Sequence, residues 1–401
     1  MASTARSQPP SAISPRRISI FPAQIWSALQ GLLIPFLAVF TAILAGSVLI
    51  LLNGRDPITA FEGLFQGALL EPRGLVDTFI KMTPLILSGL AIAFAFKSGL
   101  FNIGAQGQLI MGSVVAAWVG FAFDGLPPLI HIVLALLAAL VVGGLWASIA
   151  GVLKAYADAH EVIITIMLNY IAAKFAEWLI TAGSGGSRPG PLASPEAAQN
   201  AISRTPEILK SAELPILYTV PPRTSNTELN IGIFIAIIAS VVVMFVLYRT
   251  TFGFQVRMVG HSPNAARYAG VNVKRVTVMT MFVSGCLAGL AGGVQTLGFF
   301  HNYQGNQNLG LGFDGITVAF LAGNNPIGIN FSALLFAIMD VGKDRMALLA
   351  NIPSKLVLVI QALILMFVAA DQIIRRMYRL PKETTKAPRL KIGPRKEGAG
   401  R

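Results

Sequence analysis

A cluster of amide side chains interrupts apolar sequence in the first half of the chain. Between the apolar residues 78–96 and those that continue to Phe123, positions 97–108 read KSGLFNIGAQGQ. Asn102, Gln106 and Gln108 are costly in lipid unless they are paired or face water, and the glycines permit backbone bends. The stretch could be a simple inner-face turn, but so many amides beside so few charges favour a broken helix that lines a pathway.

A second interruption lies in the other half of the chain, where positions 323–328 read GNNPIG and carry Asn324 and Asn325. Paired interruptions in two halves of a membrane protein are the best sequence indication of a transport site. The local likeness of AFAFKSGLFNIG and AFLAGNNPIG also suggests a repeat.

Other amides could belong to the same pathway. Asn169 lies one helical turn from Thr165, so the two either line the pathway or bond across helices. Residues 300–314 are rich in Asn, Gln and Gly, and aromatic rings there could stack on a base. We predict a neutral ligand with hydroxyl and amide groups, contacted by Phe101, Asn102, Gln106, Gln108, Asn169, Asn302, Gln304, Gln307, Asn324 and Asn325.

The elements that must position these side chains are membrane-spanning helices. Of the 401 residues, 54% are hydrophobic and 12% are charged, whereas soluble domains carry about 25% charged residues. Repeated apolar runs of about twenty residues indicate an all-α, polytopic transmembrane helical bundle. The net charge of +13 lies mostly beside these runs, where it sets topology, so nucleic acid is a poor candidate partner.

Both termini are basic and are expected in the cytoplasm, which requires an even number of crossings. About ten crossings satisfy this if two short apolar pieces count separately, and eight with a re-entrant hairpin would satisfy it equally. The predicted domains are a tail at 1–28, a transmembrane domain at 29–374 and a basic tail at 375–401. The predicted apolar segments are 29–52, 78–96, 109–123, 129–153, 162–181, 231–248, 276–297, 315–322, 327–339 and 356–374.

A basic loop, residues 250–275, separates two of these segments and contains no acidic residue. Its middle predicts a short helix, because Ser262 can cap it, Pro263 suits its first position and Gly270 ends it. An ordinary positive-inside loop is the plain alternative. The sharply ended helix favours a docking surface for a cytosolic partner.

Residues 284–293 read SGCLAGLAGG, with small residues four apart on two faces, which indicates close helix packing. The single cysteine, Cys286, permits no intrachain disulfide, and no histidine has a partner at metal-ligand spacing. GLGFDG at 310–315 follows no strand, and VGKD at 341–344 lacks both the earlier glycine and the Ser/Thr of a phosphate loop. We therefore expect no metal, no cofactor and no ATP site of the Walker type.

Four motifs in order resemble a known family: FNIGAQGQLIMGS, EVIITIMLNYIA, RMVGHSPNAARYAGVNVKR and GFDGITVAFLAGNNPIG. They are similar to the permease subunits of bacterial ABC importers, in the branched-chain amino acid, simple-sugar and nucleoside family, with nucleoside-type members most alike. The resemblance covers roughly residues 29–374. Gln106 stands where these members have glutamate, which puts the exact specificity in doubt.

The resemblance implies a type II-like importer fold in the bacterial plasma membrane, with ATP hydrolysed by a partner subunit. It also implies a second permease subunit, a cytoplasmic ATP-binding cassette protein and an extracytoplasmic substrate-binding protein. We expect the two permease subunits to form a heterodimer, with a homodimer as the alternative. The solute would be a nucleoside or a simple sugar. The residues expected to dock the ATPase are Gly253, Arg257, Gly260, Pro263, Asn264, Ala265, Ala266, Arg267 and Gly270.

Two other functions remain open from the residues. An ion-coupled carrier would need intramembrane carboxylates, for which Glu177 and Asp340 are candidates, although Lys174 is close enough to neutralise Glu177. A membrane-embedded enzyme would need a nucleophile or paired acids at the surface, and no convincing set is present.

Overall fold

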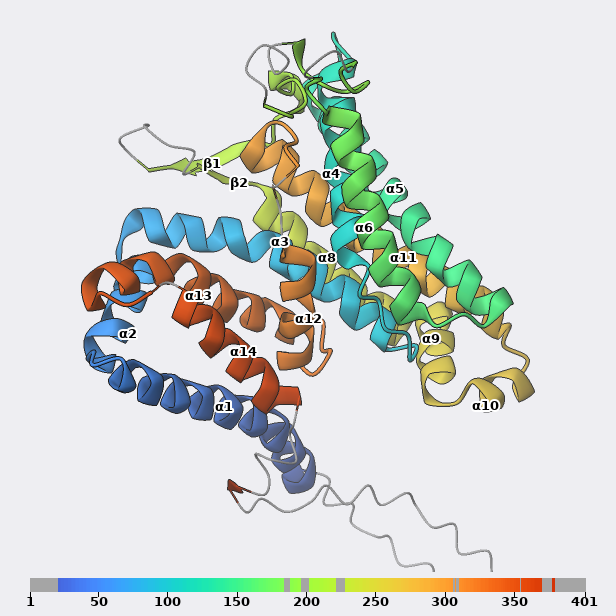
Figure 1. Cartoon of the computed structure of the whole chain (residues 1–401). Coiled ribbons are helices and arrows are strands. Elements are labelled where there is room, and N and C mark those ends of the chain that lie inside the picture. Colours follow the sequence, from blue (N-terminus) through green and yellow to red (C-terminus); the bar gives the residue numbers. More distant parts are fainter. Residues whose placement is uncertain are drawn as a thin grey trace, which may run out of the picture.

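The computed structural model of the chain is a bundle of helices with a short β-hairpin at one end (Figure 1). The structure describes residues 21–183, 188–195, 202–220, 228–305, 307, 310–353, 355–369 and 377–378. The predicted tails at 1–28 and 375–401 lie mostly outside these residues, although α1 already begins at Phe21. The predicted all-α class is confirmed in its main feature, and the hairpin is an addition that the polar residues 183–229 did not indicate.

The described residues of the first half of the chain form six helices and a π-helical turn. Their bounds are α1 Phe21–Leu52, α2 Pro57–Phe65, the turn Gln66–Leu70, α3 Pro72–Phe96, α4 Ala105–Ala122, α5 Pro128–Ala157 and α6 Glu161–Ile180.

The second half adds the hairpin and seven helices among its described residues. Their bounds are a 3₁₀ turn at Lys210–Ala212, β1 Ile216–Thr219, β2 Glu228–Asn230, α8 Gly232–Arg249, α9 Thr251–His261, α10 Pro263–Tyr268, α11 Val273–Gln295, a π-helical turn at Thr296–Phe300, α12 Leu311–Leu321, α13 Gly328–Ala350 and α14 Lys355–Ala369. The two strands are antiparallel, and Ile216 pairs with Asn230.

Within the described residues, six helices are long and apolar enough to cross a membrane: α3, α4, α5, α6, α8, and α11 with its π-helical turn. They differ in how much of the apolar stretch the chain itself covers. The buried share is 83% for α3, 78% for α4 and 72% for α11, against 28% for α5 and 33% for α6 and α8. The first three therefore form the centre of the bundle and the others its apolar periphery. The total of about ten crossings stays a prediction.

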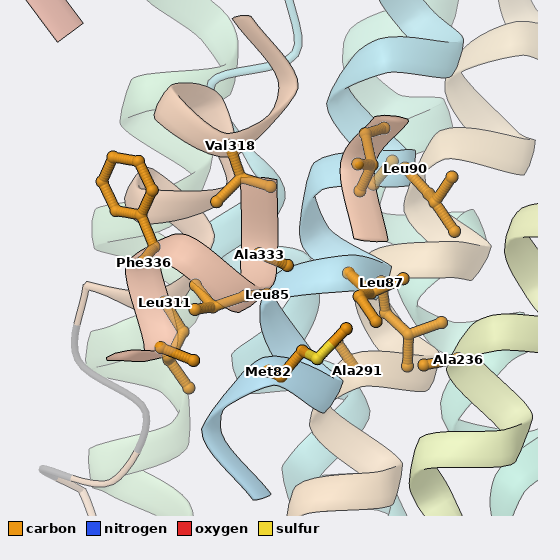
Figure 2. Packing of buried hydrophobic residues seen from close by; sticks show 14 of the residues in the cluster. Met82, Leu85, Leu87, Leu90, Ala236, Ala291, Leu311, Val318, Ala333 and Phe336 are labelled. Carbon is orange, nitrogen blue, oxygen red and sulfur yellow. The ribbon is translucent and has the colours of Figure 1, made fainter. Parts of the chain in front are cut away.

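α3 is the central packing element. In Figure 2, its Leu85 and Leu87 lie among side chains from four other helices, including Ala236 of α8, Ala291 of α11 and Val318 of α12. These contacts hold α12 in a fixed position against α3. The position of α12 in turn places the residues of the site described below.

The small residues of α11 pack as predicted. A Cβ atom added to Gly289 would lie 2.3 Å from the backbone oxygen of Ala139 in α5, and one added to Gly112 of α4 would lie 2.3 Å from that of Gly289. Such distances mean that the backbones of α4, α5 and α11 are in direct contact. The prediction of close packing over residues 284–293 is confirmed.

α9 and α10 lie at one end of the bundle, which we call the basic end, and the β1–β2 hairpin lies toward the other, the hairpin end (Figure 1). Two predictions about helix lengths were wrong. Residues 251–261, expected as loop, form α9, since Thr250 caps it and Gly253, Val256 and Val259 give it a buried face. The apolar piece expected at 327–339 continues to Ala350 as α13.

Candidate transport site and docking segment

The amide-rich break predicted at 97–108 is present between α3 and α4. α3 ends at Phe96, a turn follows with Gly99 at φ +76°, and α4 begins at Ala105. Asn102, Gln106 and Gln108 are all at most 4% exposed. Buried amides are tolerated only when their hydrogen bonds are made within the protein or to water, so their partners decide what they do.

Asn102 is the centre of the hydrogen-bond network. Its Nδ2 donates to Gln108 Oε1 at 2.9 Å and to Ser284 Oγ of α11 at 2.8 Å. Its Oδ1 accepts from Gln108 Nε2 at 2.9 Å and from the Gly104 N–H at 3.0 Å. Ser284 in turn donates to the Ala91 carbonyl of α3 at 2.6 Å. The network therefore joins α3, α4 and α11 at the break.

Two further amides connect the break to α6 and α12. Asn169 of α6 accepts from the Gly107 N–H at 2.8 Å and donates to the Ile103 carbonyl at 3.0 Å. Gln106 Oε1 accepts from the Gly312 N–H of α12 at 2.8 Å. Asn169 was expected either to line the pathway or to bond across helices. The structure shows that its side chain bonds across helices. A glutamate at position 106 could accept the same bond, so the neutral Gln106 preserves this contact.

The two interrupted segments meet through aromatic rings. Phe96 and Phe101 flank the turn at 97–99, and both contact Phe320 near the end of α12, with centroid distances of 5.4 Å and 5.8 Å. Asn324 and Asn325 follow in the turn between α12 and α13. Asn324 has φ +56° and a buried, unbonded side-chain oxygen. The two segments of similar sequence, AFAFKSGLFNIG and AFLAGNNPIG, therefore lie side by side in the structure.

The remaining predicted pathway residues lie elsewhere. Gln307 Nε2 donates to Asn302 Oδ1 at 2.9 Å, and the Gln304 N–H donates to Gln307 Oε1 at 3.0 Å. Tyr303 between them packs against Ile180, the last residue of α6, about 16 Å along that helix from Asn169. The structure thus separates this group from the break. Sequence reasoning missed Ser284, Phe96 and Phe320, and their positions beside the interruptions were the available indication.

Removal of the Asn102 side chain should loosen the bundle. In Asn102→Ala, Gln108, Ser284 and the Gly104 N–H lose buried partners, and each orphaned group costs about 1–3 kcal/mol. We expect the thermal midpoint of the purified protein to fall by several degrees, measured by tryptophan fluorescence in detergent. Asn53→Ala is the matched control, because Asn53 is exposed and makes a single bond to the Leu49 carbonyl. Equal midpoints for the two variants would contradict the assigned role.

The predicted short helix in the basic loop is confirmed as α10. The Ala265 N–H donates to Ser262 Oγ at 3.3 Å, Pro263 begins the helix, and Gly270 follows it at φ +81°. Among the predicted docking residues, Ala266 is buried, whereas Pro263, Asn264, Ala265, Arg267 and Gly270 are exposed. α10 thus presents a small, cationic surface held by a single buried alanine.

The other predicted docking residues have structural partners. Arg257 is partly buried, with its guanidinium 5.0 Å from the Tyr248 ring centre. A Cβ atom on Gly253 would lie 2.0 Å from the Val246 carbonyl oxygen, and one on Gly260 would lie 2.2 Å from the Lys97 carbonyl oxygen. Gly260 therefore places the end of α9 directly against the turn that opens the amide-rich break.

Six long apolar helices among the described residues, a buried polar break and an exposed cationic helix are the features expected of a membrane transport subunit. The comparisons agree, since residues 74–369 match the family described as branched-chain amino acid transport system, permease component. The chain belongs to this family and is thus a multi-pass permease of the plasma membrane, without an ATPase site of its own.

Three relatives match most of the chain. The guanosine ABC transporter permease protein NupP of Bacillus subtilis is 38% identical over 86% of this chain and 95% of its own length. The nucleoside ABC transporter permease protein NupB of Lactococcus lactis is 37% identical over 92% and 98%. The glucose ABC transporter permease protein TsgB13 of Haloferax volcanii is 31% identical over 86% and 89%.

A second guanosine ABC transporter permease protein of Bacillus subtilis, NupQ, is 25% identical over 65% of this chain and 78% of its own length. No solved structure gives a significant match.

Proposed function

We propose that this chain forms half of the membrane pathway of an ATP-driven importer for nucleosides. The observation that carries the proposal is the match over 86–92% of the chain to two permeases named for guanosine and for nucleosides. The neutral, amide-rich break suits an uncharged solute with many hydrogen-bonding groups. In this proposal the amides shape the pathway by fixing the break, and Asn302, Gln304 and Gln307 line it nearer the hairpin end.

The second half of the pathway is proposed to come from a different permease chain. Bacillus subtilis has two guanosine permeases, and this chain is 38% identical to one and 25% identical to the other. Two dissimilar permeases with one named solute are what a heterodimeric pathway requires. We therefore expect the partner subunit to resemble NupQ more than this chain does.

The basic end is proposed to face the cytoplasm. Residues 249–275 carry Arg249, Arg257, Arg267, Lys274 and Arg275 without any acid, as expected for a cytoplasmic segment of a bacterial membrane protein. This orientation makes α10 accessible to a cytoplasmic ATPase, and the basic composition of the tails at 1–28 and 375–401 is what supports the same side for both termini. The substrate-binding protein would then meet the hairpin end.

The ion-coupled carrier is the weaker candidate, because both carboxylates considered for it are neutralised. Glu177 pairs with Lys174 at 2.7 Å. Asp340 bonds Lys343 and lies 3.3 Å from Lys81. Paired carboxylates of this kind serve more simply as helix contacts.

Uptake by the complete importer tests the proposal. In a strain lacking the gene, radiolabelled guanosine uptake should return with the intact gene, and unlabelled nucleosides should compete while ribose, glucose and leucine do not. Uptake should stop when the partner ATPase carries a catalytic substitution and persist when ionophores collapse the ion gradients. Competition by leucine or glucose alone would contradict the nucleoside assignment, and dependence on ion gradients would contradict ATP coupling.

A further inference from the structure

α12 presents a polar and aromatic face that the described chain covers only in part, through the contacts of Phe96 and Phe101 with Phe320. Phe313, Thr317 and Phe320 are spaced by four and three residues and therefore share one side of the helix. Asp314, one turn before Thr317, flanks this side. Phe313 is 45% exposed, Asp314 is exposed, and Thr317 and Phe320 are partly exposed. We call these four residues the α12 face.

The opposite side of α12 is packed so tightly that its orientation is fixed. A Cβ atom on Gly312 would lie 2.4 Å from the Gln106 backbone, and one on Gly315 would lie 2.6 Å from Ser88 Oγ of α3. Val318 and Ala319 are fully buried. These close contacts prevent α12 from rotating about its axis. The α12 face therefore stays on the exposed side.

The same contacts place Asp314 beside the middle of α3, a helix long and apolar enough to cross a membrane. Its neighbour Gly315 packs against Ser88, and Phe320 contacts Phe96 at the end of α3. Ser88 lies eight positions before Phe96, so Asp314 lies on the order of 10 Å from the basic end of α3. A carboxylate exposed to lipid at this depth is costly, and such residues usually face a wet pathway.

The carboxylate of Asp314 has no partner within the described residues. The structure gives it no hydrogen bond and no ion pair, and the cations whose charge acts on it, Lys81 and Lys343, are both bonded to Asp340. A carboxylate can only accept hydrogen bonds. What occupies the α12 face must therefore supply donors such as hydroxyl or N–H groups.

We propose that the α12 face is a solute-contact surface of the importer, an inference that rests on the nucleoside function proposed above. Asp314 accepts hydrogen bonds from the ribose hydroxyls, Thr317 adds a hydroxyl, and the rings of Phe313 and Phe320 offer stacking surfaces to the base. The negative charge also repels phosphorylated solutes, which favours nucleosides over nucleotides.

A second permease subunit is the less suitable occupant of this face. Charged residues are depleted from the cores of protein interfaces, and covering Asp314 without a cation would leave a buried, unpaired charge at considerable cost. A small polar solute in a wet pathway leaves the carboxylate hydrated between transport cycles. The unpaired charge thus distinguishes the two occupants.

The test compares guanosine with 2′,3′-dideoxyguanosine, which lacks the 2′- and 3′-hydroxyls of the ribose, in proteoliposomes containing the complete importer and saturating binding protein. The wild-type complex should transport guanosine faster, and Asp314→Asn should lower the ratio of the two rates about tenfold. Asp314→Glu, which keeps the charge, should retain most of the preference. Asp344→Asn removes an exposed acid from α13 and should leave the ratio unchanged.

The outcomes separate this inference from the proposed function. A wild-type importer that moves no guanosine would overturn both. Normal guanosine transport with an unchanged ratio in Asp314→Asn would overturn the α12 face alone. Loss of the partner permease on purification of Asp314→Asn, with Asp314→Glu intact, would assign the face to the subunit interface and also overturn the inference.

Discussion

Combined replacement of Arg267 and Tyr268, as R267E with Y268A, should release the ATPase from the permease and stop uptake. Tyr268 is 94% exposed, and the side chain of Arg267 is exposed and makes no hydrogen bond or ion pair with a described residue. Exposed Tyr and Arg side chains on a short, rigid element are typical interface hot spots, worth about 2 kcal/mol each. Their joint loss should weaken ATPase binding about a thousandfold.

The fold should survive this double replacement because nothing that shapes α10 is changed. Ser262 still caps the helix, Ala266 is still its buried contact and Gly270 still ends it. Co-purification of the ATPase with the tagged permease measures binding, and Arg55→Glu, an equal charge change at an exposed position between α1 and α2, serves as the control. An ATPase that co-purifies in full with the double variant would refute the docking role of α10.

The α10 helix illustrates what local sequence can predict. Its cap, first residue and terminating glycine are short-range effects, and the structure reproduces each of them. The close packing of α11 is similar, because small residues four apart can meet only another backbone. The position of the amide-rich break was also predictable, since amides and glycines interrupt an otherwise apolar run.

The sequence could not show which distant residues the polar side chains bond to. Asn102 bonds Ser284, which lies 182 positions away, and Gln106 bonds the backbone of Gly312, which lies 206 positions away. α13 was expected to end near Asp340 because charges follow, yet Asp340 is paired with Lys81, and Arg345 lies 3.2 Å from Glu71. Contacts between distant segments decide whether a polar residue lines a pathway, joins helices or lies within a span.

Gly260→Ala should abolish most transport while the ATPase remains bound. Gly260 lies against the Lys97 carbonyl oxygen, at the turn between Phe96 and Phe101, and a Cβ atom there would lie 2.2 Å from that oxygen. Neither group is a flexible side-chain end, so α9 and the turn must move apart, at a cost of about 1–3 kcal/mol. Because this contact joins the docking segment to the break, we expect solute uptake to fall at least about tenfold.

The physical reason is that this contact joins the docking segment directly to the break, so a conformational change that the ATPase causes in α9 is passed to the turn at 97–99. α9 carries α10 at one end, and its last turn meets the residues that hold Phe96 and Phe101 against Phe320. Ala157→Ser is the control, since it adds a single atom at an exposed position at the end of α5, away from both interruptions. ATPase co-purification and ATP hydrolysis in proteoliposomes should stay near wild-type levels in both variants while uptake falls only in Gly260→Ala. Full uptake in that variant would show that this contact does not couple docking to the pathway.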